Sequence, residues 1–364
     1  MHGGVRSLVI AVRPSTTNIG NDLIALGLDG LLQSTWRAPV DVVALPAAGP
    51  SGGAKPIGLG ARTLYEANQL ADAVIVGAGN LLENGGLHIE REALSALRPP
   101  LAAIGISYGR VRGLDGRLHP RTDALGRADI AALCAAADPL LVRDTATADH
   151  LADLGIVNAE VAGCPAVLLD RLVDDLPAPD PDLADTALLS VRNPRLMSVP
   201  YADQGRVRAD IQRLIAGLEA VYERVVLVCH DFQDLEFAAE FEGVEARYTE
   251  QPRTFLSWIG GCAISVGYRL HAFLTAVALD RPALHISYDE RGASMISTLG
   301  LEAFDVPLHA TADVAGAVLD RLGPARPRQE AEDVLAALHA VLLSGVEGLE
   351  ARAFEYRAAR SAIA

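Results

Sequence analysis

Two residues of one triplet, Arg269 and His271, are of types that bind an anion and move a proton. They open the segment "RLHAFLTAVALD", whose small and apolar residues predict a helix directly after a short apolar strand. The first turn of a helix has free N–H groups and a positive dipole end, and both favour an anion. A guanidinium binds two anionic oxygens at once, and an unperturbed histidine has a pKa suited to proton transfer. The triplet therefore predicts an anion site with an acid or base beside it.

Polar residues also follow three other predicted strands of the carboxy-terminal half. They are Arg192, His230 and Tyr288. The carboxyl ends of parallel strands meet at one edge of a sheet, where ligands bind, so we expect these side chains to join Arg269 and His271. Two observations weigh against this interpretation. A lone histidine is most often a hydrogen-bonded core residue, and arginine is the default basic residue here because Lys55 is the only lysine.

Glycine and asparagine turns follow strands of the amino-terminal half. The segments "NIGND" and "GAGN" supply six candidate contacts to a ligand: Asn18, Gly20, Asp22, Gly77, Gly79 and Asn80. Glycine loops are common in α/β proteins, and neither a G-x-G-x-x-G nor a P-loop pattern is present, so a purely structural role is the alternative. Arg143 and Asp144 follow a further strand, and we favour a local ion pair at a helix N-terminus for them.

These residues need an alternating α/β scaffold to bring them together. Short apolar or β-branched runs predict strands in the amino-terminal half at 7–12, 40–45, 73–76, 101–106 and 140–142. Helical patterns between and after these strands predict helices at 24–34, 58–71, 90–97, 124–136 and 146–154. Such alternation predicts a parallel sheet with helices on both faces.

The pattern restarts after an acidic, proline-rich stretch that we interpret as a linker. Further strands are predicted at 187–191, 224–229, 263–266, 283–287 and 303–306, with helices near 209–222 and 235–241. The predicted fold class is α/β, with two Rossmann-like doubly wound domains that face a cleft. The predicted boundaries are a first domain at 1–175, a linker at 176–185, a second domain at 186–322 and a helical tail at 323–364. We expect this tail either to pack across the domains or to form a homodimer contact.

Composition narrows the classes of partner. The 364 residues carry a formal net charge of −15, which disfavours a nucleic-acid partner because a phosphate backbone would be repelled. The four cysteines have no zinc-type spacing, and we interpret Asp231 and Asp234 as solvated loop carboxylates, so no metal site is predicted. The amino-terminal apolar run is short, and no unbroken apolar stretch approaches about 18 residues. These features predict a cytoplasmic protein without an integral membrane segment.

Four segments resemble the polysaccharide pyruvyl transferase family, in the family's order. They are "NIGNDLIALGLDGLL", "ADAVIVGAGNLLENGG", "LLVRDTATADHLADLGI" with "VAGCPAVLL", and "ISVGYRLHAFLTAVALDRPALHISYDERGASMISTLGL". In the last segment an Arg-Leu-His triplet opens a helix and Tyr-Asp closes the next strand, as in the family. The departures are mild: Asn21-Asp22 replaces Asp-Glu, Ala78 interrupts a run of three glycines, Thr147 replaces Ser, and Tyr268 replaces Met.

The resemblance implies a GT-B-like fold and a transferase that uses phosphoenolpyruvate as donor substrate, with no further cofactor. It implies donor binding by Arg192, Arg269, His230 and Tyr288, with His271 as the proton donor or shuttle. The loops around Asn18–Asp22 and Gly77–Asn80 would face a sugar or lipid-linked sugar acceptor. Two alternatives stay open on the sequence alone: a GT-B glycosyltransferase with a nucleotide-sugar donor, and a non-catalytic binding protein of the same fold.

Overall fold

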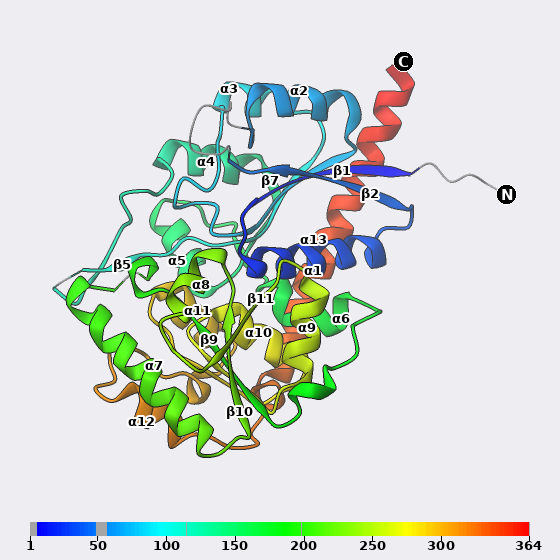
Figure 1. The fold of residues 1–364 in the computed structure, drawn as a ribbon. Coiled ribbons are helices and arrows are strands. Elements are labelled where there is room, and N and C mark those ends of the chain that lie inside the picture. The colour runs from blue at the N-terminus through cyan, green and yellow to red at the C-terminus, as the bar shows by residue number, and fades with distance from the viewer. Residues whose placement is uncertain (1–5, 49–56, 114, 198, 364) are drawn as a thin grey trace.

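The computed structural model describes residues 6–48, 57–113, 115–197 and 199–363. Lys55 and the start of the amino-terminal apolar run lie outside these residues. The described chain forms two parallel sheets, one from each half, with helices packed between and around them (Figure 1). The α/β prediction of two doubly wound units is confirmed.

The first sheet has six parallel strands in the order β2-β1-β3-β4-β7-β8. They are β1 (Ser7–Arg13), β2 (Val40–Pro46), β3 (Ala73–Gly79), β4 (Leu101–Ile106), β7 (Ala137–Val142) and β8 (Glu160–Val161). Its helices are α1 (Ile19–Thr35), α2 (Ala61–Leu70), α3 (Arg91–Ser95), α4 (Arg127–Ala136) and α5 (Thr145–Asp153). The strands β5 (Val111–Arg112) and β6 (Leu118–His119) form a small antiparallel hairpin. Every residue of β4 is buried, as expected of a central strand covered on both faces.

The second sheet has five parallel strands in the order β11-β10-β9-β12-β13. They are β9 (Thr186–Val191), β10 (Arg224–Cys229), β11 (Glu245–Tyr248), β12 (Ile264–Gly267) and β13 (Ala283–His285). The remaining helices are α6 (Leu169–Leu172), α7 (Gln204–Glu219), α8 (Phe232–Ala238), α9 (Pro252–Gly261), α10 (Leu270–Ala278), α11 (Glu290–Thr298), α12 (Val314–Leu319) and α13 (Pro327–Ile363).

Each strand order reverses direction at one point of its sheet. In the first sheet the reversal lies between β1 and β3, and in the second it lies between β9 and β12. Loops that leave neighbouring strands in opposite directions open a crevice at the carboxyl ends, which is where ligands bind in such sheets. The loops after β9 and β12 carry Arg192 and the Arg-Leu-His triplet, and the loops after β1 and β3 carry the glycine–asparagine turns.

One apolar core runs through both halves. It includes Val9 and Ile75 of the first sheet, Leu28 of α1, and Leu189 and Val266 of the second sheet. A separate core fills the other face of the first sheet. Because the two halves share buried side chains through α1 and α10, the loops at the carboxyl ends of the two sheets are held at a fixed separation.

The carboxy-terminal helix α13 packs across both halves, which confirms one of the two expectations for the tail; the homodimer contact stays a prediction. Near its start, Arg328 donates to the carbonyl of Ala278 at the end of α10 (2.8 Å). Near its end, Arg357 donates to Asp72 before β3 (3.0 Å). Figure 1 shows the helix running the length of the molecule.

Among the described residues, α13 alone is long and apolar enough, by length and composition, to cross a membrane. In this structure one stripe of the helix is buried against the rest of the chain, including Leu335, Leu342 and Leu349. The expectation that no segment spans a membrane stays a prediction.

Several predicted elements differ from the structure. The predicted strand at 303–306 is wrong: Glu302–Phe304 form a 3-10 helix, and only Asp305 pairs with a strand residue, through an isolated bridge to His285. The strand β11 and the helix α9 were not predicted at all. The predicted linker packs against α9, where Ser257 donates to the carbonyl of Ala178 (2.7 Å). Nothing in the structure tests the predicted domain boundaries.

Candidate active site

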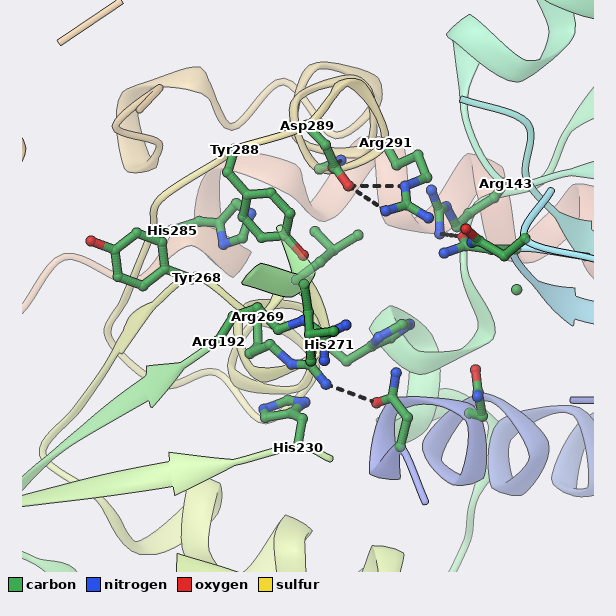
Figure 2. Close-up of a pocket in the computed structure, with 18 of the residues that line it drawn as sticks. Arg143, Arg192, His230, Tyr268, Arg269, His271, His285, Tyr288, Asp289 and Arg291 are labelled. Atoms are coloured by element: carbon green, nitrogen blue, oxygen red, sulfur yellow. Dashed lines mark hydrogen bonds and ion pairs between the residues drawn. The ribbon is translucent and has the colours of Figure 1, made fainter. Parts of the chain in front are cut away.

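A cavity of about 380 Å³ lies where the carboxyl ends of the two sheets face each other; we refer to it as the first cavity. Eight of the predicted site residues line it: Asn18, Gly79, Asn80, Arg192, His230, Arg269, His271 and Tyr288. They come from loops after β1, β3, β9, β10, β12 and β13, so strand ends of both sheets contribute to a single site (Figure 2).

Arg192 and Arg269 share one fully buried carboxylate. Oδ1 of Asp234 lies 3.4 Å from Nη1 of Arg192, and Oδ2 of Asp234 lies 3.4 Å from Nη2 of Arg269. Burial lowers the pKa of Arg269, against the opposing effect of Asp234, and Arg192 lowers it further. Two guanidiniums with one counter-charge leave a net positive charge facing the cavity, which an incoming anion would neutralise. The prediction of a solvated Asp234 is wrong, because its side chain has no exposed surface.

Arg269 also bonds across the cleft. Its Nη2 donates to Oδ1 of Asn18 at 3.3 Å, and the same Asn18 oxygen caps α1 by accepting from the N–H of Gly20 (3.1 Å). A second link joins the halves nearby, where the N–H of Ile19 donates to the carbonyl of His230 (2.8 Å). The first turn of α1 is therefore held directly against the arginines of the second half.

Two further arginines lie across the cavity from Arg192 and Arg269 (Figure 2). Arg143 pairs with Asp144, as the sequence predicts, through Nε at 3.0 Å. It also lines the cavity, and its buried Nη2 has no hydrogen-bond partner among the described residues. Arg291 donates to Glu83 from Nη1 (2.8 Å) and to Asp289 from Nε (2.9 Å). An unpaired guanidinium nitrogen in a buried site is costly unless a ligand accepts from it, so Arg143 points to an anionic occupant.

His271 lies between these two pairs of arginines. Burial lowers its pKa to about 3, and the charges of Arg143 and Arg269 contribute to that shift. Its Nε2 lies 3.8 Å from Sγ of Cys164. The ring is therefore neutral near pH 7 in the free protein, and it becomes able to accept and pass on a proton only when an anion offsets the surrounding positive charge.

Two other histidines line the cavity in neutral form. Burial lowers the pKa of His230 well below its usual value, and the charges of Arg269, His271 and Arg192 lower it further; its Nε2 has no partner. Burial also lowers the pKa of His285, whose Nδ1 lies 3.1 Å from the carbonyl of Gly267. If Nδ1 donates to that carbonyl, Nε2 of His285 is left as an acceptor.

Three predicted residues lie outside the lining of the first cavity. Gly20 packs behind His271, where a β-carbon would lie 2.4 Å from the ring Nδ1. Gly77 lies inside β3, where a β-carbon would lie 2.2 Å from the carbonyl oxygen of Ile104, so its role is strand packing. Asp22 lines a neighbouring cavity, in which burial and the charge of Glu250 raise its pKa to about 6.

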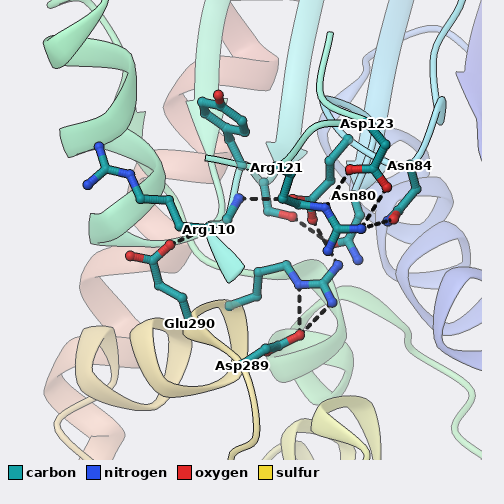
Figure 3. Close-up of polar contacts among 12 residues, drawn as sticks. Asn80, Asn84, Arg110, Arg121, Asp123, Asp289 and Glu290 are labelled. Atoms are coloured by element: carbon teal, nitrogen blue, oxygen red, sulfur yellow. Dashed lines mark hydrogen bonds and ion pairs between the residues drawn. The ribbon is translucent and has the colours of Figure 1, made fainter. Parts of the chain in front are cut away.

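A polar network joins the two halves above the cavity (Figure 3). The fully buried Glu83 accepts from Arg291 (2.8 Å) and from the N–H of Gly109 (3.2 Å), and Nε of Arg121 lies 3.6 Å from it. On the other side of α11, Glu290 lies 2.9 Å from Nε2 of His150. These contacts position α11 and with it the guanidinium of Arg291.

The sequence-based selection missed further lining residues: Asn21, Asn84, Arg121, Arg143, Tyr268, His285, Asp289 and Arg291. Arg143 and Arg291 do follow predicted strands, and that position could have identified them as candidate site residues. For Asn84 and Arg121 no such clue exists, because their place depends on how loops pack across the cleft. Among the described residues, no group of three histidine, cysteine or carboxylate side chains could hold a metal ion.

The comparisons with known proteins bear on both the sequence and the fold. A sequence model of the family described as polysaccharide pyruvyl transferase matches residues 18–290, which include strands of both sheets and every lining residue of the first cavity except Arg291 and Gly292. The chain belongs to the polysaccharide pyruvyl transferase family. It is accordingly a transferase, and the Arg-Leu-His triplet lies within the matched region. No curated protein matches the chain.

The fold of this pyruvyl transferase family member is similar to that of solved UDP-N-acetylglucosamine 2-epimerases. UDP-N-acetylglucosamine 2-epimerase from Rickettsia bellii superposes with a TM-score of 0.53 at 12% identity, over 95% of this chain and 98% of that one. UDP-GlcNAc 2-epimerase from Methanocaldococcus jannaschii gives a TM-score of 0.51 at 11% identity, over 92% and 99%. These likenesses support the GT-B-like fold, and at such identities they indicate the fold alone.

Proposed function

We propose that the protein transfers the pyruvyl group of phosphoenolpyruvate to two hydroxyls of a sugar-containing acceptor, with release of phosphate. The observation that carries the proposal is the arrangement of the first cavity: of its five buried or half-buried arginines, Arg192 and Arg269 form one pair, Arg143 and Arg291 form a second, and His271 lies between the pairs. Phosphoenolpyruvate carries a phosphate and a carboxylate on one carbon, and it therefore offers an anionic group to each pair.

The chemistry balances without a further cofactor. A proton adds to C3 of phosphoenolpyruvate, and the oxygen of a first acceptor hydroxyl bonds to C2. The oxygen of a second hydroxyl then bonds to C2 as the C2–O bond to phosphate breaks. Of the two hydroxyl protons, one replaces the proton delivered to C3 and the other leaves with the phosphate. The product is a cyclic ketal.

The residues of the first cavity suit these steps. Arg192 and Arg269 stabilise the leaving phosphate, since preorganised cations act where negative charge develops. His271, neutral in the free protein, gains basicity when the donor's negative charge offsets Arg143 and Arg269. It can then hold the proton that reaches C3 and recover it from the attacking hydroxyl.

Donor binding is the first test. Titration calorimetry with phosphoenolpyruvate and, separately, with UDP-sugars compares wild type, Arg269→Lys and the control Arg62→Lys, at an exposed position of α2. We expect phosphoenolpyruvate to bind and Arg269→Lys to weaken it about thirtyfold or more, because a lysine loses the planar fork of donors. Binding of a UDP-sugar in place of phosphoenolpyruvate would instead identify a nucleotide-sugar glycosyltransferase.

Turnover is the second test. Phosphate release and mass spectrometry of the acceptor follow ketal formation in wild type and His271→Gln. We expect His271→Gln to retain donor binding and to lose most of the turnover. Donor binding without any product, unchanged by His271→Gln, would indicate a non-catalytic binding protein.

A further inference from the structure

A second cavity of about 510 Å³ adjoins the first one, and Asn21 lines both. Asp22, Ala25, Leu26 and Asp29 form one wall, on a single face of α1. The second half contributes Glu250 from the loop before α9. The second cavity therefore lies at the seam between the halves, next to the reacting centre of the proposed transfer.

The two cavities have opposite charge. Five arginines and one carboxylate line the first cavity, whereas three carboxylates and one arginine line the second. That arginine, Arg13, is already paired with Asp29, whose carboxylate oxygens lie 3.2 and 3.3 Å from its Nη1. Asp22 and Glu250 thus leave the second cavity with excess negative charge, which disfavours a phosphate or a carboxylate inside it.

Glu250 is exposed and contacts Tyr248, which itself reaches across the seam. Tyr248 Oη lies 2.9 Å from the carbonyl of Thr17 and 3.0 Å from Oε1 of Glu250, so Tyr248 connects Glu250 to the loop before α1. Asn21 is fixed as well, because its Nδ2 donates to Oγ1 of Thr16 (2.7 Å). These contacts place Glu250 beside the seam and hold Asn21 at the junction between the cavities.

We propose that the second cavity binds the acceptor as an uncharged sugar, whose free hydroxyl pair reaches past Asn21 into the first cavity. This proposal rests on the proposed function. Carboxylates accept hydrogen bonds from hydroxyls and offer nothing to an anion, and Ala25, Leu26 and Pro252 give an apolar surface for the C–H face of a sugar ring. Burial, with Glu250 nearby, raises the pKa of Asp22 to about 6, in agreement with two close carboxylates.

A steric variant tests the site without touching the first cavity. Ala25→Trp places a large ring in the second cavity, and Ala152→Trp, at an exposed position of α5, is the matched control. Saturation-transfer NMR measures binding of methyl glycosides and of the same glycosides as 6-phosphates, and calorimetry measures binding of phosphoenolpyruvate. We expect wild type and Ala152→Trp to bind the neutral glycosides in preference to the phosphates, and Ala25→Trp to lose glycoside binding with the donor dissociation constant unchanged.

A charge variant tests the selectivity. Asp22→Asn should weaken the binding of neutral glycosides about tenfold, because it removes a charged hydrogen-bond acceptor. It should also reduce the ratio by which neutral glycosides bind more tightly than their 6-phosphates. Glycoside binding by Ala25→Trp equal to that of the control, or a wild-type preference for the phosphates, would overturn the proposal. Loss of glycoside binding in Ala25→Trp without any binding of phosphoenolpyruvate would refute the proposed donor and leave this sugar site standing.

Discussion

The imidazole of His271 lies directly against the backbone of Gly20, so closely that a β-carbon on Gly20 would be 2.4 Å from Nδ1 of the ring. These two residues come from different halves of the molecule. Glycine is required here by space, since the structure gives Gly20 an ordinary helical place as the second residue of α1. The close approach fixes where His271 stands relative to the loops of the first sheet.

Gly20→Ala should therefore displace His271 while leaving the fold intact. We expect the turnover number to fall at least tenfold, while the thermal midpoint changes by only a few degrees. Gly205→Ala is the matched control, because Gly205 is also the second residue of a helix and a β-carbon there meets nothing within 4 Å. Equal turnover in both variants would show that the contact with Gly20 does not position the histidine.

Asp234→Asn should make the free protein less stable and the donor more strongly stabilising. Removing the carboxylate that contacts both Arg192 and Arg269 leaves a half-buried and a buried cation with less counter-charge, which costs about 3 kcal/mol of unfolding free energy. Bound phosphoenolpyruvate replaces the missing charge, so its shift of the thermal midpoint should exceed that of wild type. Urea unfolding without the donor measures the free energy, and thermal unfolding with and without the donor measures the shift of the midpoint. An unchanged unfolding free energy would contradict the shared-carboxylate role.

Stability should fall in mild acid because of His271. Its pKa is about 3 in the folded protein and about 6.5 when unfolded, so the unfolded state binds more protons between these values. The contribution is fully present above pH 6.5 and is lost as the pH falls towards 3, roughly 2 kcal/mol of it by pH 5. Urea unfolding at pH 7 and pH 5 should show a smaller loss in His271→Gln than in wild type. An equal loss in both would mean that the ring is already protonated or solvent-exposed.

Donor binding should take up protons. A bound anion offsets the charges of Arg143 and Arg269 and so raises the pKa of His271, which then gains a proton from solution more readily as the pH falls. Calorimetry at pH 5.5 in two buffers of different ionisation enthalpy should give different apparent enthalpies for phosphoenolpyruvate, and the difference should shrink in His271→Gln. Identical buffer dependence in wild type and variant would assign the uptake to another group.

The sequence predicts the strand-end residues well because strand ends are a local property. The apolar runs before Arg192, His230 and Arg269 identify three parallel strands, and parallel strands bring their carboxyl ends to one edge. The edge strand β11 escaped prediction because its sequence, Glu-Ala-Arg-Tyr, has no apolar run, and two of its four residues are exposed.

Contacts between the halves could not be predicted from the sequence. Arg291 enters the first cavity because Glu83, some two hundred positions earlier, holds its guanidinium across the cleft. The hydrogen bond from Arg269 to Asn18 joins residues that are similarly far apart along the chain. Sequence periodicity does not predict such contacts, because they depend on the angle at which the two sheets pack. The sequence-based assignment of some loops to the acceptor and others to the donor therefore did not predict that these loops contact each other.

The path of α13 has a consequence for the order in which the protein assembles. Gly345 of this helix lies so close to β7 that a β-carbon would be 2.7 Å from Leu141, and Leu338 covers Gly163. The surface of the first sheet on that side is thus covered by a helix that is synthesised after the strands of both sheets. Domains fold from the amino terminus during synthesis, yet here the strands that α13 covers keep apolar side chains uncovered until that helix has been made. A chain released before Pro327 would expose that face to aggregation.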